Sequence, residues 1–209
     1  MRYTCVMSKT AKGRATRQAF QDAARRVFER DGYLNARLSD IAEEAGKSMA
    51  SFYNYFDSKE ALLTDLATDF DTELQAKVAE PFERGLAPHD ALPEAIRAFY
   101  RHYRTRLPDV VGIVQASMVD PKFAADWREI RTNGVRTISI GIRRAQRDGW
   151  APGLDPMLAA SALSSMLEHF CWVWLAQGGD AIDVELEEDH AVDTLWKLWS
   201  HAIYWTEAE

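Results

Sequence analysis

The chain of 209 residues lacks several features that define other protein classes. It has only two cysteines, Cys5 and Cys171, which is too few for a disulfide framework. The longest strongly apolar run, residues 170–176, is far shorter than the about 20 residues that span a bilayer. The stretch 10–17 is polar and basic, unlike the apolar core of a signal peptide. We therefore expect a cytoplasmic protein with no membrane anchor.

Sequence patterns of enzymes and metal sites are also missing. The chain contains no His-Glu-x-x-His, phosphate-binding glycine loop, Cys-x-x-Cys or nucleophile elbow. The five histidines are scattered, and Glu168 and His169 point to different faces of a helix because they are adjacent. We predict that the chain is not an enzyme and binds neither a metal nor a cofactor. An enzyme or a helical small-molecule-binding protein stays open as an alternative.

The charge of the chain is unevenly distributed. Residues 1–59 hold 11 basic and 7 acidic side chains, whereas the remaining residues hold 14 and 25. The overall formal charge of −7 therefore hides a basic head of +4 on an acidic body of −11. This asymmetry indicates two separate tasks.

The spacing of apolar residues predicts an all-α fold of about nine helices. Apolar side chains recur at steps of three and four, and alternating strand patterns with Asn-Gly turns are absent. Proline and glycine separate the periodic segments. The predicted helices cover residues 14–30, 38–45, 49–56, 58–80, 90–106, 110–119, 121–148, 155–177 and 187–207.

Two short helices joined by a tight turn within the basic head predict a helix-turn-helix. Gly46 allows the sharp turn, and Ser48 is suited to cap the second helix. Phe52 and Phe56 point inward, so the opposite side of this helix is free to enter a major groove. The expected DNA-contacting residues on and beside that side are Arg37, Lys47, Ser48, Met49, Ala50, Ser51, Tyr53, Asn54, Tyr55 and Lys59.

Fixed spacings across residues 14–63 resemble the TetR (tetracycline-repressor-like) family. They are Phe28-x-x-x-Gly32-Tyr33, Asp40-Ile41-Ala42-x-x-Ala45-Gly46-x-Ser48 and Phe52-Tyr53-x-Tyr55-Phe56-x-Ser58-Lys59-Glu60-x-Leu62-Leu63. The resemblance implies a homodimeric transcription regulator whose heads bind a near-palindromic operator in double-stranded DNA. It also implies a helical body that binds a small effector, and a phosphate contact for Lys59.

Three positions depart from the family pattern. Lys47 stands where a small aliphatic residue is usual, and Ala50 stands where glycine is frequent. Arg37 replaces a threonine that caps the first short helix, a loss of about 1 kcal/mol. Arg37 offers a phosphate or groove contact instead.

The segment before the first helix is basic. Lys9, Lys12, Arg14 and Arg17 suit an arm that enters the adjacent minor groove. A solvated tail is an equally open interpretation, and Met7 is an alternative start of the native chain.

The body is rich in aromatic and sulfur-containing side chains with polar groups among them. This composition suits a pocket for a small apolar effector, although plain core packing would give the same helical stripes. The expected pocket residues are Phe99, Tyr103, Met118, Trp127, Met166, His169 and Phe170.

The last two predicted helices are apolar around most of their circumference. A helix of this kind must be covered on both sides, which predicts a homodimer through a four-helix bundle. A buried hairpin within one chain is the alternative. The residues expected at the dimer interface are Leu163, Trp174, Leu195, Trp199 and Ala202.

Together these features divide the chain into a flexible basic arm (1–13), a helix-turn-helix domain (14–57) and an effector-binding and dimerisation body (58–209). The predicted function is a transcriptional repressor that a small apolar effector releases from a palindromic operator. A DNA-binding protein without an effector remains an alternative.

Overall fold

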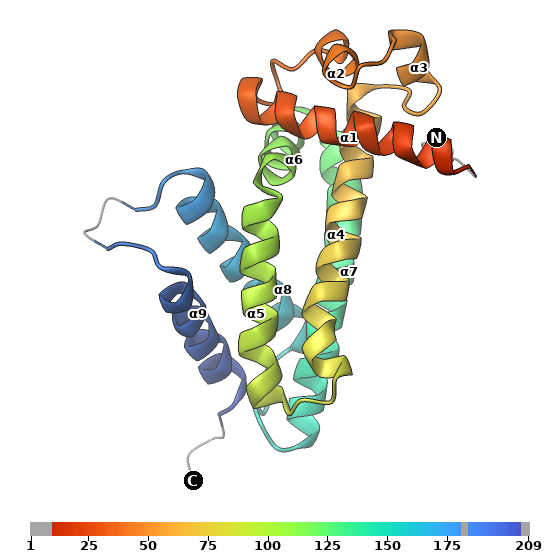
Figure 1. Ribbon diagram of the computed structural model, residues 1–209. Coiled ribbons are helices and arrows are strands. Elements are labelled where there is room, and N and C mark those ends of the chain that lie inside the picture. Colours follow the sequence, from red (N-terminus) through yellow and green to blue (C-terminus); the bar gives the residue numbers. More distant parts are fainter. Residues whose placement is uncertain (1–9, 181–183, 206–209) are drawn as a thin grey trace. The chain divides into compact units, whose positions relative to one another are not determined.

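The computed structural model describes residues 10–180 and 184–205, and this part of the chain is all-α, as predicted (Figure 1). It contains nine α-helices and one π-helical turn, and no strand occurs among the described residues. The helices are α1 (Ala11–Asp31), α2 (Leu38–Glu44), α3 (Met49–Tyr53), α4 (Lys59–Glu83), α5 (Pro88–Thr105), α6 (Leu107–Val119), α7 (Pro121–Arg147), α8 (Pro156–Cys171) and α9 (Glu188–Ile203); the π-helical turn η1 (Trp172–Ala176) continues α8.

Side-chain caps explain where several helices begin. The Thr10 hydroxyl accepts a hydrogen bond from the Gly13 amide at 3.1 Å, so α1 starts three residues before its predicted first residue. Asp155 accepts from the amides of Met157 and Leu158 and is followed by a proline, which suits the first turn of α8. At α4 the capping oxygen belongs to Ser58, which accepts from the Ala61 amide.

The chain forms two compact units. Unit 1 comprises Met1–Phe70 and Arg106–Ile130, of which the first nine residues lie outside the described part. Unit 2 comprises Asp71–Thr105 and Arg131–Glu209. The unit that holds the helix-turn-helix therefore includes α6 and the first part of α7, in addition to the predicted segment 14–57.

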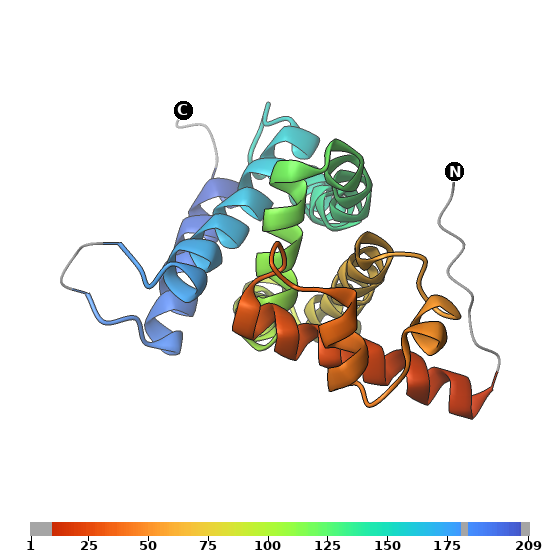
Figure 2. The ribbon, with the colours of Figure 1, turned by 90° about the horizontal axis from the view of Figure 1, so that it is seen from above.

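The core of unit 1 is built on aromatic side chains of α1 and α3. Phe20 and Phe52 are fully buried, and their rings meet edge to face with centroids 5.3 Å apart. Leu62, Leu63 and Leu66 of α4 complete this core. Helix α1 packs on α2 and on α6, and α2 packs on α3 (Figure 2).

Helix α6 fits closely into unit 1 because it carries a glycine at the contact. A Cβ atom at Gly112 would lie 3.2 Å from Leu63 Cδ1 and 3.6 Å from a ring carbon of Phe28. One turn further along, the Gln115 side-chain oxygen accepts a hydrogen bond from the Tyr33 amide at 2.9 Å. These contacts anchor α6 at the end of α1.

The core of unit 2 joins α5, α7, α8 and α9. Its buried members include Ile96, Ile142, Leu167 and Val192, and α5 packs on both α8 and α9. Three arginines of α5, Arg97, Arg101 and Arg104, converge on Glu188 in the first turn of α9 and reinforce the α5–α9 contact. Within residues 10–180 and 184–205, no helix combines the length and the apolar character needed to cross a membrane.

Replacing Phe20 with alanine tests the aromatic core. Phe20→Ala removes a fully buried ring, so the free energy of unfolding should fall by about 3–5 kcal/mol. Leu34→Ala, at a side chain 53% exposed, is the matched control and should change it by less than about 0.5 kcal/mol. Urea denaturation followed by circular dichroism measures both. Equal losses for the two variants would contradict this account of the core.

Candidate nucleic-acid interface

The turn between α2 and α3 has the geometry of a helix-turn-helix. Gly46 has a φ of +63°, a conformation that L side chains rarely adopt. The Lys47 amide donates to the Ala42 carbonyl at 2.9 Å and closes the end of α2. As predicted, Ser48 caps α3, because its hydroxyl accepts from the Ser51 amide at 3.1 Å.

Helix α3 presents a clear outer side. Phe52 is fully buried and Phe56 is 3% exposed, so both anchor α3 and the residues that follow it. On the opposite side, Ala50 and Asn54 are exposed and Tyr53 is 54% exposed. Ser51 is half-buried, whereas Met49 and Tyr55 also pack against the core of unit 1. The surface predicted for base contact is therefore available in its central part.

Two cationic residues flank this surface. Arg37 has extended backbone angles at the first position before α2, and its side chain makes no capping hydrogen bond. Lys47 is exposed in the turn, and the described part of the chain gives neither side chain an ion pair. Both charges are therefore available for phosphate groups.

The structure gives Lys59 a different role from the predicted phosphate contact. Its ammonium donates to the carbonyls of Tyr33 at 2.7 Å and Ala36 at 2.9 Å, and it lies 4.4 Å from the centroid of the Tyr33 ring. A third, longer contact reaches the Leu34 carbonyl. Burial lowers the pKa of Lys59. Since the carbonyls engage its donors, Lys59 ties α4 to the loop between α1 and α2.

The basic residues before α1 do not share one role. Lys9 lies outside the described residues, while Lys12 and Arg14 are exposed on the first turns of α1. Arg17 pairs with Asp65, which is 8% exposed, and therefore belongs to the α1–α4 contact. The predicted arm up to residue 13 is thus partly helical, because Thr10 starts α1.

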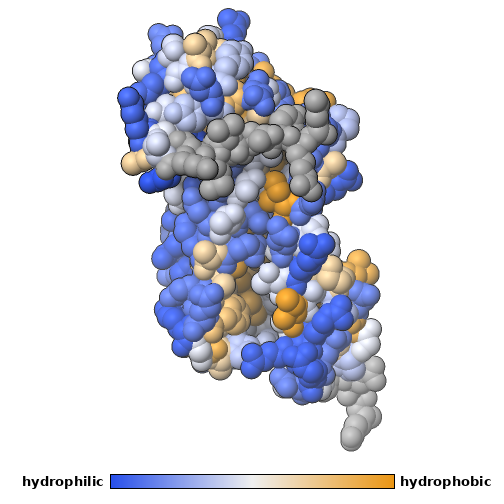
Figure 3. Space-filling model, turned by 90° about the vertical axis from the view of Figure 1, so that its right-hand side faces the viewer, coloured by the Kyte–Doolittle hydropathy of each residue, from blue (hydrophilic) through white to orange (hydrophobic). Residues whose placement is uncertain are grey.

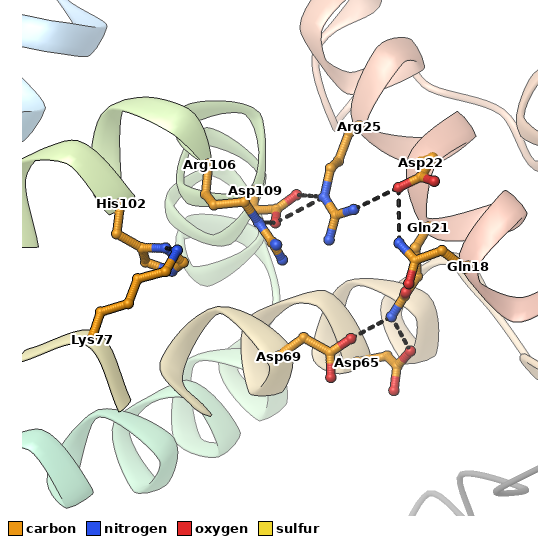
Figure 4. Close-up of polar contacts among 10 residues, drawn as sticks. All are labelled: Gln18, Gln21, Asp22, Arg25, Asp65, Asp69, Lys77, His102, Arg106 and Asp109. Carbon is orange, nitrogen blue, oxygen red and sulfur yellow. Dashed lines mark hydrogen bonds and ion pairs between the residues drawn. The ribbon is translucent and has the colours of Figure 1, made fainter. Parts of the chain in front are cut away.

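A buried ionic cluster joins α1 to α6 (Figure 4). Asp109 is fully buried, and its carboxylate accepts hydrogen bonds from Arg25 Nε at 3.1 and 3.2 Å and from Arg106 Nε at 2.7 Å. Arg25 also donates to Asp22 at 2.9 Å. Burial raises the pKa of Asp109, whereas the two arginines act in the opposite direction.

A second polar cluster joins α1 to α4. The buried Gln21 side chain donates to Asp65 at 2.9 Å and to Asp69 at 2.6 Å (Figure 4). The sequence analysis found neither cluster. The only signal for them was a glutamine and an arginine close to the apolar face of the first predicted helix.

The residues predicted to line an effector pocket do not all lie in the same unit. Phe99 and Tyr103 stack along α5 with centroids 6.0 Å apart. Met118 and Trp127 belong to unit 1, where Met118 is 79% exposed and Trp127 packs against Phe70. The prediction is therefore wrong for Met118, which lies on the surface, and Trp127 contributes to the packing of unit 1.

The other three predicted pocket residues line an open groove along α8 and η1. This groove has a volume of about 560 Å³. Its lining consists of Ala162, Ser165, Met166, His169, Phe170, Val173, Trp174 and Asp180. Because these side chains face solvent along one side of α8, the groove is a surface feature of unit 2.

Unit 2 also carries buried and half-buried polar groups. Arg131 pairs with Glu168 at 2.7 Å, and Glu168 accepts from the Ser164 hydroxyl at 2.8 Å. Lys77 Nζ lies 2.9 Å from Nδ1 of the buried His102. Burial raises the pKa of the Asp71 carboxyl and of the Tyr103 hydroxyl, and raises that of the Cys171 thiol to about 12. These groups bring hydrogen-bonding capacity into the unit.

Three residues predicted for the dimer interface are instead part of the core of unit 2. Leu163, Leu195 and Trp199 are 7%, 1% and 8% exposed, because α8 and α9 turn these side chains toward the rest of the unit. Ala202 is exposed and Trp174 is half-buried. The large apolar side chains left on the surface of α8 and α9 are Met157, at 38%, Leu158, at 73%, and Leu198, at 56%.

Comparison with known proteins identifies the architecture. Residues 21–66 match the family model of bacterial regulatory proteins of the tetR family, and residues 92–205 match the C-terminal domain of the transcriptional regulator EthR. The chain belongs to the TetR family. It is a DNA-binding transcriptional regulator with a helix-turn-helix and not an enzyme. Among the described residues, no three histidine, cysteine or acidic side chains are grouped as a metal site.

Several relatives of this TetR-family chain are similar over most of their length. The HTH-type regulator EthR of Mycolicibacterium smegmatis is 24% identical over 220 residues, covering 97% of this chain and 96% of the relative. BetI of Rhizobium meliloti is 32% identical over 167 residues, covering 78% and 75%. The structure of FadR from Bacillus subtilis in complex with stearoyl-CoA superposes with a TM-score of 0.76, at 18% identity, covering 90% and 99%.

The role of Lys59 is tested by removing its charge while keeping its stem. Lys59→Met should lower the free energy of unfolding by about 1–2 kcal/mol, because three carbonyls lose a charged donor. The salt dependence of DNA binding should stay unchanged. Lys47→Met, the control, should leave stability unchanged and reduce the slope of log K against log salt by about 0.9. If Lys59→Met keeps wild-type stability but reduces the slope of log K against log salt, Lys59 contacts a phosphate as first predicted.

Proposed function

We propose that this regulator is a homodimeric repressor that binds a near-palindromic operator and leaves it when a small apolar effector binds. The observation that carries the proposal is the outer side of α3. Ala50, Tyr53 and Asn54 stand exposed on a helix that two buried phenylalanines and a serine cap hold in place. Such a surface is suited to base edges in a major groove.

Affinity and specificity come from different residues in this proposal. Arg37, Lys47, Tyr53 and the exposed cations at the start of α1 contact phosphates, so they contribute salt-dependent binding to any duplex. Asn54 and its neighbours in 48–54 contact bases. In a dimer, two copies of α3 lie in successive major grooves about 34–36 Å apart.

The dimer forms through the outer faces of α8 and α9. Leu158, Ala162 and Met166 follow one another along α8 at helical spacing, and Leu198 and Ala202 do so along α9. Two of these side chains, Leu158 and Leu198, expose more than half of their surface in the single chain. Covering this face with the same face of a second copy gives an isologous four-helix bundle.

The effector binds in unit 2, where aromatic side chains such as Phe99 and Tyr103 are combined with hydrogen-bonding groups. The structural neighbour FadR, solved in complex with stearoyl-CoA, supports an effector with a large apolar part. To release the operator, the effector must bind one conformer of the protein more tightly than the other.

The signal reaches the head through helices that both units share. Helices α4 and α7 each begin in unit 1 and end in unit 2. Helix α6 of unit 1 follows α5 of unit 2 with only Arg106 between them. Because Asp109 holds α6 to α1, a displacement of α6 would be transmitted to the helix-turn-helix. In this proposal α6 and α4 together act as the lever between the two units.

A binding selection on random duplex DNA, read by sequencing at moderate salt, tests the proposed function. Enrichment of a palindrome with half-sites about one helical turn apart is the expected result. Candidate effectors are then screened for release of the selected duplex. Enrichment of an asymmetric single site, or release by no apolar compound, would contradict the proposal.

Paired substitutions separate the base contacts from the phosphate contacts. Asn54→Ala should reduce discrimination between the operator and single-base variants, with a loss of about 1–3 kcal/mol at one base position. Arg37→Ala should weaken binding to every duplex alike and lower the salt slope by about 0.9. Fluorescence anisotropy with a panel of duplexes measures both. Unchanged sequence preference in Asn54→Ala would show that the recognition surface lies elsewhere.

The proposed dimer face is tested by placing a charge on it. Leu158→Asp should convert the dimer to a monomer, because an unpaired carboxylate would be buried at the interface. Leu34→Asp is the control, since Leu34 is an exposed leucine of unit 1. Sedimentation velocity gives the mass of each variant. A Leu158→Asp protein that stays dimeric with wild-type stability would place the interface on another face.

A further inference from the structure

One face of α7 in unit 2 is strongly basic. Residues 131–147 contain five arginines, no lysine and no acidic residue. Arg136, Arg143, Arg144 and Arg147 are exposed, and we call them the arginine face. Positions 136, 140, 143 and 147 follow one another at steps of four, three and four, so they lie along one side of the helix. Ile140, in their midst, is 67% exposed.

The arginine face differs from the other arginines of unit 2. Arg97, Arg101 and Arg104 pair with Glu188, and Arg131 pairs with Glu168. In residues 10–180 and 184–205, no ion pair involves a member of the arginine face. Four guanidinium groups are thus exposed to solvent on a chain whose net charge is −7. Because Arg side chains pair readily with carboxylates, this surface is suited to an acidic partner.

An acidic surface lies at the end of α4 and the start of α5. Its members are Glu80, Glu83, Asp90 and Glu94, which are all exposed, and we call them the acidic corner. Arg84 contacts Glu80 and Glu94 and holds the corner together, leaving a surplus of negative charge. Phe82, between two of the glutamates, is 45% exposed. The acidic corner therefore resembles the arginine face in having one exposed apolar side chain among charged residues, but its net charge is negative.

The two surfaces are neighbours within unit 2. Helices α4 and α7 run side by side (Figures 1 and 2), and a Cβ atom at Gly134 would lie 2.9 Å from the Gln75 amide nitrogen. Phe82 and Gly141 lie two turns further along these two helices. A Cβ atom at Gly141 would have no neighbouring atom within 4 Å, so the surface is open there. Figure 3, from the side where α4 and α7 lie, shows hydrophilic side chains gathered around a few apolar ones in its lower half.

We propose that this α4–α7 face of unit 2 binds the same face of a second copy of the chain. A twofold axis between the two surfaces brings the arginine face of each copy against the acidic corner of the other. Ile140 and Phe82 then meet at the centre and the charges form the rim, which is the usual composition of a protein interface. Because α8 and α9 stay free for the dimer proposed above, this second contact joins dimers, and two such contacts made at once close a pair of dimers.

The observations favour a protein partner over a nucleic acid. A phosphate backbone on the arginine face would also approach the acidic corner, whose carboxylates repel it. The cations are all arginines and surround an apolar side chain, a combination that is enriched in protein interfaces. Binding of DNA by the arginine face is therefore an outcome that the experiment must be able to detect.

A charge-swap experiment tests the proposal. Arg143→Glu with Arg147→Glu reverses part of the arginine face, and Glu83→Arg with Asp90→Arg reverses part of the acidic corner. Sedimentation velocity over a range of concentrations compares each variant with the wild type. We expect wild-type dimers to associate into tetramers at low salt. The tetramers should dissociate at about 0.5 M salt, where the Debye length is only about 4 Å and the charges are screened. Each double variant should associate at least about tenfold more weakly.

An equimolar mixture of the two double variants provides the decisive arm. In the mixture, the reversed arginine face of one variant meets the reversed acidic corner of the other, and the two unchanged surfaces meet as in the wild type, so tetramers should form again. Lys12→Glu with Arg14→Glu, on exposed positions of α1, has the same net charge as the arginine-face variant and should associate like the wild type. Circular dichroism confirms that each variant is folded.

Three results would overturn the proposal. They are wild-type dimers that never associate, association that survives reversal of the arginine face, and a mixture that stays dimeric. If the arginine-face variant instead loses affinity for an arbitrary duplex while its mass is unchanged, the face contacts nucleic acid. The proposed function is judged separately, because operator binding by the isolated dimer should be the same in both double variants.

Discussion

The buried carboxylate of Asp109 is the interaction on which the architecture of the DNA-binding unit depends. It has no exposed surface, and two arginines, one from α1 and one preceding α6, donate to its oxygens. A carboxylate in this position is tolerated only because it is paired, and loss of one partner from a buried pair typically costs about 3–5 kcal/mol. The close contact at Gly112 and the hydrogen bond from Tyr33 to Gln115 extend the same junction. Helix α6 is therefore a structural part of the head.

This position of α6 gives a physical basis for control of DNA binding. The proposed recognition helix α3 is short and has little stability of its own, so its orientation depends on α1, α2 and α4, which the core around Phe20 holds together. Lys59 and the Gln21 cluster fix α4 to this core, and Asp109 fixes α6. The chain passes from unit 2 into the head within α4, between α5 and α6, and within α7, so a change in the packing of unit 2 has these covalent connections to the head.

The sequence predicted most of the local structure because helices, caps and turns depend on near neighbours. Gly46, Ser48 and the two buried phenylalanines have the positions expected from their spacing. Contacts between residues far apart in the sequence could not be predicted from near neighbours. Arg25 and Asp109, for example, are 84 residues apart, and neither lies in a recognisable motif. The same limit explains Lys59, whose partners precede it in a loop. On α8 and α9, apolar residues surround the helix, so periodicity alone could not separate Leu163 in the core from Leu158 on the surface.

A double-mutant cycle on Arg25 and Asp109 tests the central claim most directly. Arg25→Gln, Asp109→Asn and the double variant are compared with the wild type by urea unfolding and by operator affinity. If the pair joins α6 to the head, each single variant loses both stability and affinity, and the double variant loses clearly less than the sum of the two. The coupling should exceed about 1 kcal/mol in the free energy of unfolding. Additive losses in stability, or unchanged operator affinity in all three variants, would contradict the claim that α6 is part of the DNA-binding head.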